Sequence, residues 1–232
     1  MPIDYNRRPS APQPEDRQPA VSLSKVTLTK AAPRVSLTKR GGTGGVLRVN
    51  LNWNSRPAAP QQRGGFLAKL TGAGAGGSGA VDLDLGALYE YADGSKGAVQ
   101  ALGGAFTDGR PRPLLRLDAD DRSGAASGGE NLHVDLSDPA AIKRVLVYAF
   151  IYEGTPNWAE ADAVVTLFPA SGAEVEVRLD EHDPRSRMCA VALITSDGRE
   201  VTVQREVRYV EGGQQALDEA YGWGMRWRTG RK

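Results

Sequence analysis

Short stretches in which apolar and polar residues alternate recur along most of this chain, and they constrain its fold more than any other feature. Successive side chains of a β-strand point to opposite faces, so strict alternation predicts strands that bury one face. Predicted strands lie within 21–39 and at 46–53, 81–86, 113–117, 131–136, 143–152, 163–168, 174–179, 188–195 and 200–210. The most apolar stretch, 144–152, is predicted to be a central strand, because such strands are covered on both faces.

Turn dipeptides separate several of these stretches. Asp93-Gly94, Asp108-Gly109 and Asp197-Gly198 are flanked by apolar residues and favour hairpins. Only residues 212–221 show a helical pattern. Many short strands with regular turns predict an all-β fold, namely a β-sandwich of two packed, mostly antiparallel sheets with one short C-terminal helix.

A five-residue motif, Val-[Ser/Thr]-Leu-[Ser/Thr]-Lys, occurs three times near the start of the chain, at 21–25, 26–30 and 35–39. Each copy alternates as a half-buried strand does. The repeat unit is too short for a solenoid. The sequence leaves open whether this segment folds back on the sandwich or pairs with another chain.

Composition divides the chain into a tail and one domain. Residues 1–20 are rich in Pro, Arg, Gln and Asp, which predicts a disordered tail. Residues 21–232 are predicted to form the sandwich domain, with a flexible Gly/Pro-rich linker inserted at 55–80. Within that linker the glycines match G-x-G-x-x-G. The dinucleotide motif needs a strand before it and a helix after it, so we reject this match.

The formal charge of +1 is unevenly distributed. Residues 1–80 carry 12 Lys/Arg and 3 Asp/Glu, a net charge of +9, whereas 81–232 carry 17 and 25, a net charge of −8. This uneven charge indicates either two surfaces with different partners or a basic tail that simply keeps the protein soluble. The single cysteine excludes an intrachain disulfide, and the sequence shows neither a signal peptide nor a transmembrane segment. We therefore expect a cytoplasmic protein.

Acidic residues gather in two places. Residues 81–86 read as a strand that presents Asp82 and Asp84 on one face, ~7 Å apart. Residues 118–132 form a Gly/Ser-rich stretch with acids at both ends. Ca²⁺ takes oxygen ligands from carboxylates and flexible loops, so the two stretches together predict a Ca²⁺ site. The alternative is that these acids are simply solvated on the surface.

Several motifs in this order resemble those of one family. They are the repeat copies at 26–30 and 35–39, Asn-Trp-Asn at 52–54, Asp-Leu-Asp-Leu at 82–85, Asp-Asp-Arg-Ser-Gly at 120–124 and Glu-Asn at 130–131. Together they resemble the TerD-domain proteins of bacterial tellurium-resistance and stress-response operons. The segments 84–89, 124–131 and 220–224 resemble the TerA-like branch.

The resemblance implies a β-sandwich that binds Ca²⁺ through its acidic segments. Asp82 and Asp84 match the family's D-x-D strand, Asp120 and Asp121 match the acid/amide pair before Ser-Gly, and Glu130 matches the closing acid. These five residues are the metal ligands that the resemblance implies.

The chain also departs from the family pattern. Residues 126–129 are Ala-Ser-Gly-Gly where an acidic run is usual, and Asn54 stands where the family has an acid. Because Ca²⁺ affinity follows the number of charged ligands, fewer acids imply fewer or weaker sites.

The resemblance further implies a non-enzymatic stress-response or tellurite-resistance protein, acting as a cytoplasmic scaffold or interaction module. Expected partners are Ca²⁺ and other proteins of the same system, with a place at the inner membrane face and no nucleic acid. One alternative is a Ca²⁺-dependent module that holds a sugar or phospholipid head group. Another is an oxyanion-processing enzyme, which the single cysteine and the lack of a cofactor motif argue against.

Other chemistry-bearing residues favour structural roles. A zinc site from His182, Asp183 and Cys189 is conceivable, but Cys189 lies in an apolar run that favours a buried thiol. His133 alternates with apolar neighbours and is expected to face solvent. The aromatic segment 221–227 is expected to pack on the sandwich, with a partner interface as the alternative.

Overall fold

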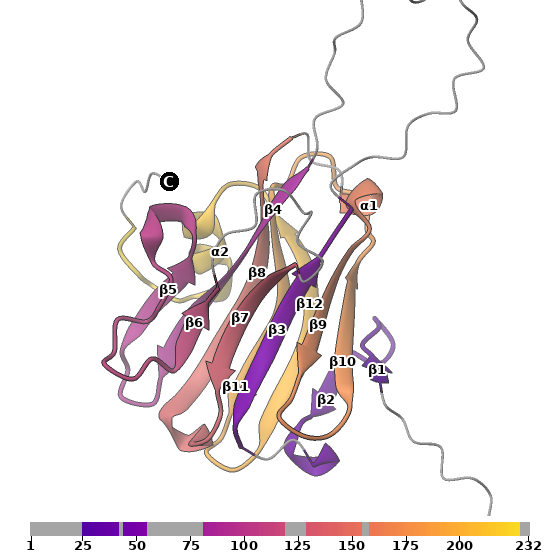
Figure 1. Ribbon diagram of the computed structural model, residues 1–232. Helices are drawn as coiled ribbons and strands as arrows, with labels where there is room; N and C mark the ends of the chain where they lie inside the picture. The colour runs from indigo at the N-terminus through magenta and orange to yellow at the C-terminus, as the bar shows by residue number, and fades with distance from the viewer. Residues whose placement is uncertain (1–24, 42–43, 55–80, 119–128, 155–157, 228–232) are drawn as a thin grey trace, which may run out of the picture.

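Two six-stranded sheets packed face to face make up the computed structural model, which describes residues 25–41, 44–54, 81–118, 129–154 and 158–227 (Figure 1). This arrangement confirms the all-β sandwich. The tail predicted at 1–20 and the linker predicted at 55–80 lie outside the described residues, so the division into tail and domain stays a prediction.

The first sheet contains strands from both halves of the chain. Its order is β1 (Lys25–Thr27), β10 (Glu174–Leu179), β9 (Ala163–Phe168), β3 (Val46–Asn52), β7 (Glu130–Asp135) and β6 (Leu115–Leu117). All neighbours are antiparallel except β1 and β10, which run parallel.

The second sheet is entirely antiparallel. Its order is β2 (Arg34–Ser36), β12 (Val201–Val210), β11 (Met188–Ser196), β8 (Ile142–Glu153), β4 (Asp82–Tyr91) and β5 (Lys96–Gln100). Strand β8, predicted to be central, lies between β11 and β4. The Asp93-Gly94 turn joins β4 to β5, and Asp197-Gly198 joins β11 to β12, as predicted. Asp108-Gly109 instead lies between strands of different sheets, next to a bridge between Thr107 and Arg116.

The predicted C-terminal helix is α2 (Gln214–Tyr221), which lies on the outer face of the second sheet (Figure 1). A one-turn helix that was not predicted, α1 (Trp158–Ala161), buries Trp158. Short 3₁₀ turns occur at Thr38–Arg40, Leu102–Gly104 and Pro139–Ala141.

The main core lies between the sheets and is built from alternate residues of their facing strands. A second apolar cluster lies on the other face of the second sheet, beneath α2, and includes Leu88, Leu146, Tyr148 and Leu217. Strands β4, β8 and β11 therefore bury side chains on both faces. This explains why 144–152 is apolar throughout, whereas strands with one solvated face alternate.

The N-terminal repeat folds back on the sandwich, which answers the question that the sequence left open. Strand β1 extends the first sheet beside β10, and β2 extends the second sheet beside β12. The lysine that ends each copy forms an ion pair with a glutamate of the sandwich, namely Lys25 with Glu176, Lys30 with Glu181, and Lys39 with Glu200. The segment thus closes one side of both sheets.

The C-terminal aromatic segment packs on the second sheet, as expected. The carboxylate of Asp218, which is 3% exposed, accepts hydrogen bonds from the backbone of Gly224 and Met225 and from the indole of Trp227, at 2.8–3.0 Å. Trp223 is 1% exposed, and the guanidinium of Arg144 stacks on its ring at 3.7 Å.

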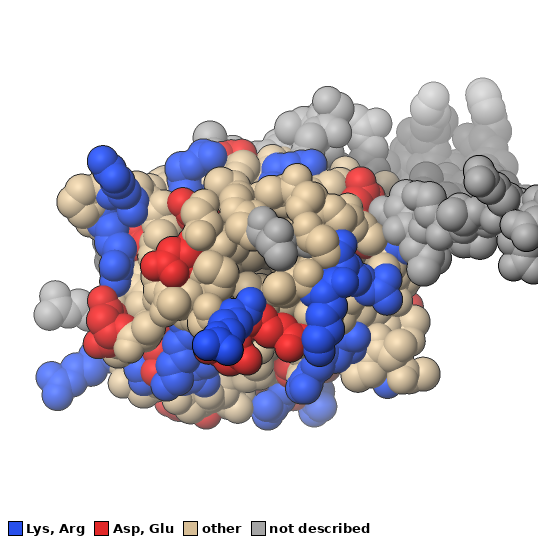
Figure 2. Space-filling model, turned by 90° about the horizontal axis from the view of Figure 1, so that it is seen from below, with Lys and Arg blue, Asp and Glu red and all other residues tan. Residues whose placement is uncertain are grey.

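Charged side chains of both signs are interspersed on the face seen from below (Figure 2). Among the described residues, no helix is long and apolar enough to cross a membrane.

Candidate metal centre

The strand that carries Asp82 and Asp84 begins at one end of the sandwich, beside the start of β7 (Figure 1). The indole of Trp53, which is 4% exposed, donates to the carbonyl of Val81 at 3.0 Å. This bond ties the residue after β3 to the residue before β4. A buried tryptophan therefore fixes the residue next to Asp82.

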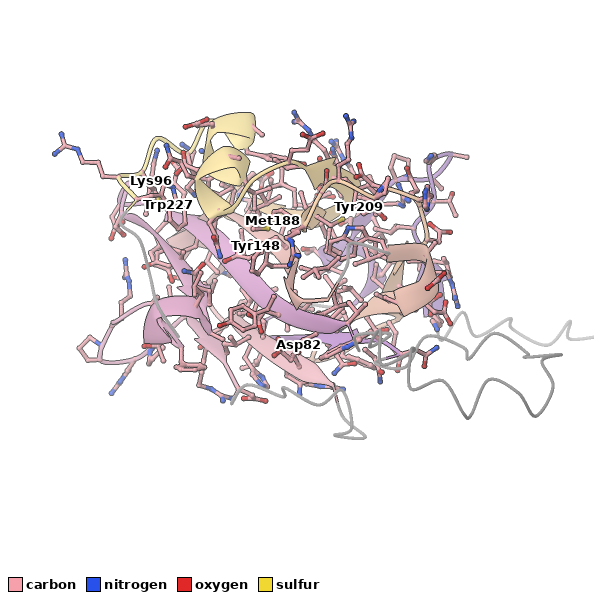
Figure 3. The ribbon with its side chains drawn as sticks, turned by 90° about the horizontal axis from the view of Figure 1, so that it is seen from above. Asp82, Lys96, Tyr148, Met188, Tyr209 and Trp227 are labelled. Carbon is pink, nitrogen blue, oxygen red and sulfur yellow. The ribbon has the colours of Figure 1, made fainter. Side chains whose placement is uncertain are left out.

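Both acids of β4 are buried, with Asp82 9% and Asp84 5% exposed. The alternative that they are simply solvated does not describe them. The pairing of β4 with β8 shifts register between Asp82 and Leu83, which marks a β-bulge. Bulges redirect side chains and are frequent beside functional sites. Figure 3 views this end of the molecule from above, with Asp82 labelled.

Asp84 lies on the outer face of the second sheet, where the ring of Tyr148 crosses Gly86. A Cβ at Gly86 would lie 2.5 Å from that ring, so only glycine leaves room for it. The hydroxyl of Tyr148 donates to Gln100 at 2.6 Å. Burial raises the pKa of Tyr148, and the charge of Asp84 raises it further. Tyr148 is therefore a neutral hydrogen-bond donor beside this acid.

Glu130 approaches β4 from the other sheet. It is 2% exposed, and its Oε2 accepts a hydrogen bond from the backbone amide of Leu85 at 2.5 Å. The pairing of β5 with β4 covers only Gly86 to Glu90, so the Leu85 amide lies just beyond that ladder. The carboxylate thus links the two sheets where β5 ends.

The position of Glu130 depends on the glycine before it. Gly129 has φ +59°, and a Cβ there would collide with the carbonyl oxygen of Leu51. On the other side, the Oδ1 of Asn131 accepts from Arg48 at 3.1 Å and from Asn50 at 3.0 Å. Sequence reasoning did not single out these supports, although the Gly-Gly pair at 128–129 was a signal for the tight approach.

The remaining predicted ligands, Asp120 and Asp121, lie outside the described residues. Asp118, the last described residue before them, bonds Arg116 at 2.5 Å and His133 at 3.1 Å. Burial raises the pKa of Asp118, but the bonds and charges of His133 and Arg116 outweigh it, so the pKa lies below its ordinary value. His133 is 20% exposed and held by this contact, so it does not simply face solvent.

The donor chemistry of Asp82, Asp84 and Glu130 fits a hard cation, because all three supply carboxylate oxygens. They come from two sheets but lie at the same end of the sandwich. Within the residues that the structure describes, however, no group of three or more His, Cys, Asp or Glu side chains is arranged to hold a metal. A complete site therefore requires donors beyond the described ranges.

The zinc alternative is not supported by the described residues. Cys189 is fully buried, and burial raises the pKa of its thiol well above the ordinary value. The carboxylate of Asp183 accepts the amides of Arg185 and Ser186 at 2.9 and 2.8 Å. This geometry is that of a structural turn, and the prediction that Cys189 is a buried thiol is confirmed.

The fold places this chain in the class of two-sheet β-sandwiches with buried acids at one end. This is the fold that the resemblance to the TerD-domain proteins implied. The chain is 43% identical over 212 residues to the tellurium resistance protein TerA of Alcaligenes sp. The match covers 91% of this chain and 60% of that protein, so the chain spans about three-fifths of its relative. Over that shared length the chain is similar to a tellurium resistance protein of the TerA type, and the resemblance is confirmed.

Two solved structures align with this one over most of both chains. SAV2460, a protein of unknown function, is 17% identical with a TM-score of 0.50, over 73% of this chain and 91% of its own. A homologue of the telluride resistance protein TerD from Streptomyces coelicolor A3(2) is 19% identical with a TM-score of 0.46, over 75% and 95%. The first likeness concerns the fold alone. No protein-family model matches the chain.

Proposed function

We propose that this chain is a Ca²⁺-binding, non-enzymatic module of a tellurium-resistance and stress-response system. Asp82, Asp84 and Glu130 would hold the ion together with Asp120 and Asp121. The observation that carries the proposal is the burial of three carboxylates from two sheets at one end of the sandwich. Hard cations are bound by carboxylate oxygens, which is the donor chemistry that these three residues bring to this end of the sandwich.

When bound, the ion supplies positive charge that offsets the mutual repulsion of these acids. The chain's own residues provide the frame. Glu130 links β7 to the Leu85 amide of β4, and Trp53 holds the start of β4. Ca²⁺ would therefore join the two sheets at this end and connect them to the segment that carries Asp120 and Asp121.

The role we propose is that of a cytoplasmic scaffold or interaction module, with partners among other proteins of the same system and a place at the inner membrane face. The similarity to a tellurium resistance protein supports the setting. Cys189 supports the non-enzymatic part, because a fully buried thiol with a raised pKa is neutral and shielded.

Calorimetric Ca²⁺ titration, with thermal melts in Ca²⁺, Mg²⁺ and EDTA, tests the metal. Free Ca²⁺ at 100 times Kd is expected to add about 2.7 kcal/mol to the free energy of unfolding. The double variant Asp82→Asn/Asp120→Asn should lose this gain. The control Glu211→Gln removes an exposed acid and should keep it. Identical melts of the wild type in all three solutions would reject the proposal.

The sugar or phospholipid head-group module stays a prediction. It requires that the ligand and Ca²⁺ raise each other's affinity, because binding linkage is reciprocal. Titrating Ca²⁺ with and without vesicles containing anionic phospholipid, or a panel of simple sugars, distinguishes it from the scaffold. Unchanged Ca²⁺ affinity would leave the scaffold as the better account.

A further inference from the structure

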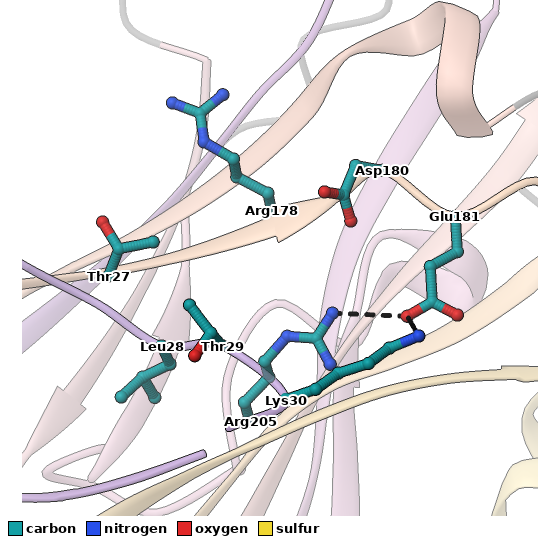
Figure 4. Close-up of a pocket in the computed structure, with 8 residues that line it drawn as sticks. All are labelled: Thr27, Leu28, Thr29, Lys30, Arg178, Asp180, Glu181 and Arg205. Carbon is teal, nitrogen blue, oxygen red and sulfur yellow. Dashed lines mark hydrogen bonds and ion pairs between the residues drawn. The ribbon is translucent and has the colours of Figure 1, made fainter. Parts of the chain in front are cut away.

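A cleft of about 300 Å³ opens on the side of the sandwich where the N-terminal segment crosses from one sheet to the other (Figure 4). Thr27, Thr29 and Lys30 line it from that segment, and Arg178 and Glu181 line it from the end of β10. Arg205 of β12 lines it from the second sheet. This side lies across both sheets from β4 and β7, so the cleft is separate from the candidate metal centre.

Arg205 is the unusual member of this group, because its side chain is only 10% exposed. Its Nη2 donates to the Oε1 of Glu181 at 3.4 Å, which is the one hydrogen bond that the guanidinium makes with described residues. A guanidinium offers five N–H donors in a planar fork that matches the oxygens of carboxylate or phosphate. Because the buried guanidinium of Arg205 makes one long hydrogen bond to Glu181, its other N–H groups can donate to a ligand that carries oxygen atoms.

The carboxylate of Glu181 is shared between two cations. The same Oε1 that Arg205 contacts also pairs with the Nζ of Lys30 at 3.1 Å. Figure 4 shows the Lys30 and Arg205 side chains converging on Glu181, whereas Arg178 points away from them. The Nε of Arg178 pairs instead with Glu176 at 3.0 Å. The single carboxylate of Glu181 thus pairs with two converging cations, Lys30 and Arg205.

Near Glu181 the lining holds two cations and two acids, because Lys30 and Arg205 face Asp180 and Glu181, whereas Arg178 points away and pairs with Glu176. The remaining donors of the guanidinium fork, not a net charge, therefore favour an anion. The hydroxyl oxygen of Thr29 accepts the Ala32 amide at 3.1 Å, and its own proton remains able to donate.

We propose that this cleft binds a small anion through a carboxylate or phosphate group. The fork of Arg205 holds two oxygens of that group, and Lys30 and the hydroxyl of Thr29 complete the contacts. Thr29 and Lys30 are the last two residues of the second repeat copy, Val26-Thr-Leu-Thr-Lys30. This repeat copy therefore supplies a wall of a binding site as well as an edge strand.

The test titrates the full-length protein, freed of divalent cations on a chelating resin and kept in a buffer without carboxylates, with inorganic phosphate and, separately, with succinate, at fixed ionic strength. Calorimetry or amide chemical shifts give Kd. We expect saturable binding of at least one anion, and the tighter one identifies the group. Arg205→Lys keeps the charge but loses the fork, and should weaken binding at least tenfold. Lys30→Gln alters an exposed side chain and should weaken it several-fold.

Arg178→Gln is the matched control, because it removes a lining charge that points away from Glu181. Its Kd should stay within twofold of wild type. Absence of saturable binding by either anion would overturn the proposal. Equal weakening in Arg205→Lys and Arg178→Gln would overturn it as well, since that result means unspecific attraction. Because divalent cations are removed throughout, neither outcome depends on the proposed Ca²⁺ site.

Discussion

Glu90 and Glu130 are both buried glutamates, 5% and 2% exposed, but their surroundings differ. Glu90 accepts hydrogen bonds from Lys143 at 2.7 Å and Arg144 at 2.6 Å, beneath the C-terminal aromatic segment. Glu130 accepts the backbone amide of Leu85 at the end of the sandwich where the buried acids Asp82 and Asp84 also lie. Burial alone therefore does not mark a site. The described partners separate the two, because Glu90 forms ion pairs with Lys143 and Arg144, whereas Glu130 accepts a neutral backbone amide.

The largest expected effect is the loss of the ion pairs of Glu90. Glu90→Gln should lower the free energy of unfolding at pH 7 by about 3 kcal/mol, because it leaves Lys143 and the partly buried Arg144 without their carboxylate partner. The hydrogen bond from Lys143 lowers the pKa of Glu90 most; burial raises it, and Arg144 lowers it further, to about 2 from 4.5. This stabilisation is present above pH 4.5 and is lost as the pH falls toward 2. Urea unfolding across that range checks both effects.

The control for this variant is Glu219→Gln, which changes an exposed acid on α2 and should stay within about 0.5 kcal/mol of wild type. The difference between wild type and Glu90→Gln should shrink as the solution is acidified. If it were constant with pH, the carboxylate of Glu90 would not be the group that titrates.

Glu130→Gln is the next largest change, and its sign should depend on the metal. In EDTA it should leave the free energy of unfolding unchanged or raise it by up to about 1 kcal/mol, because an amide oxygen still accepts the Leu85 amide and one negative charge is gone. In Ca²⁺ at 100 times Kd it should lack most of the wild-type gain of about 2.7 kcal/mol. Paired urea curves with Ca²⁺ and with EDTA measure this. A loss in EDTA as large as that of Glu90→Gln would mean that the two glutamates play the same structural role.

Gly129→Ala tests the backbone that positions Glu130. It should cost about 2 kcal/mol, because φ of +59° and the collision with the Leu51 carbonyl both disfavour a side chain. Gly94→Ala is the matched control: it also has positive φ, +83°, but open space around its Cβ, so about 1 kcal/mol is expected. Denaturation curves give both values, and Ca²⁺ titration should show weaker binding for Gly129→Ala only. Equal costs would mean that the approach to Leu51 relaxes freely.

The smallest effect concerns the C-terminal aromatic segment, which lies over Glu90. Asp218→Asn weakens bonds to the Gly224 and Met225 amides and to the Trp227 indole, and should cost about 1 kcal/mol. Tryptophan fluorescence should report the loosened segment, while Ca²⁺ affinity stays unchanged. A change in Ca²⁺ affinity would show that the two regions are coupled.

Local pattern predicted much of this structure. Alternation located β3, β7, β9 and β10 within a residue or two, because each has one face in the core and one outside. Asp-Gly turns predicted two hairpins, and the helical pattern at 212–221 became α2. Strand β4 runs on to Tyr91, past the predicted end at 86, because its second half is buried on both faces and lacks the alternation that marks a strand.

The sequence by itself determined the fold class, most strands and the family resemblance, since these depend on periodicity and on motifs that are contiguous in the chain. It also singled out Asp82, Asp84 and Glu130, but not that all three are buried. Only the tertiary structure decided which residues meet. It placed two repeat copies on different sheets, and it brought Lys30 and Arg205 to Glu181. The physical reason is that alternation assigns a side chain to a face, whereas sheet order and packing decide what covers that face.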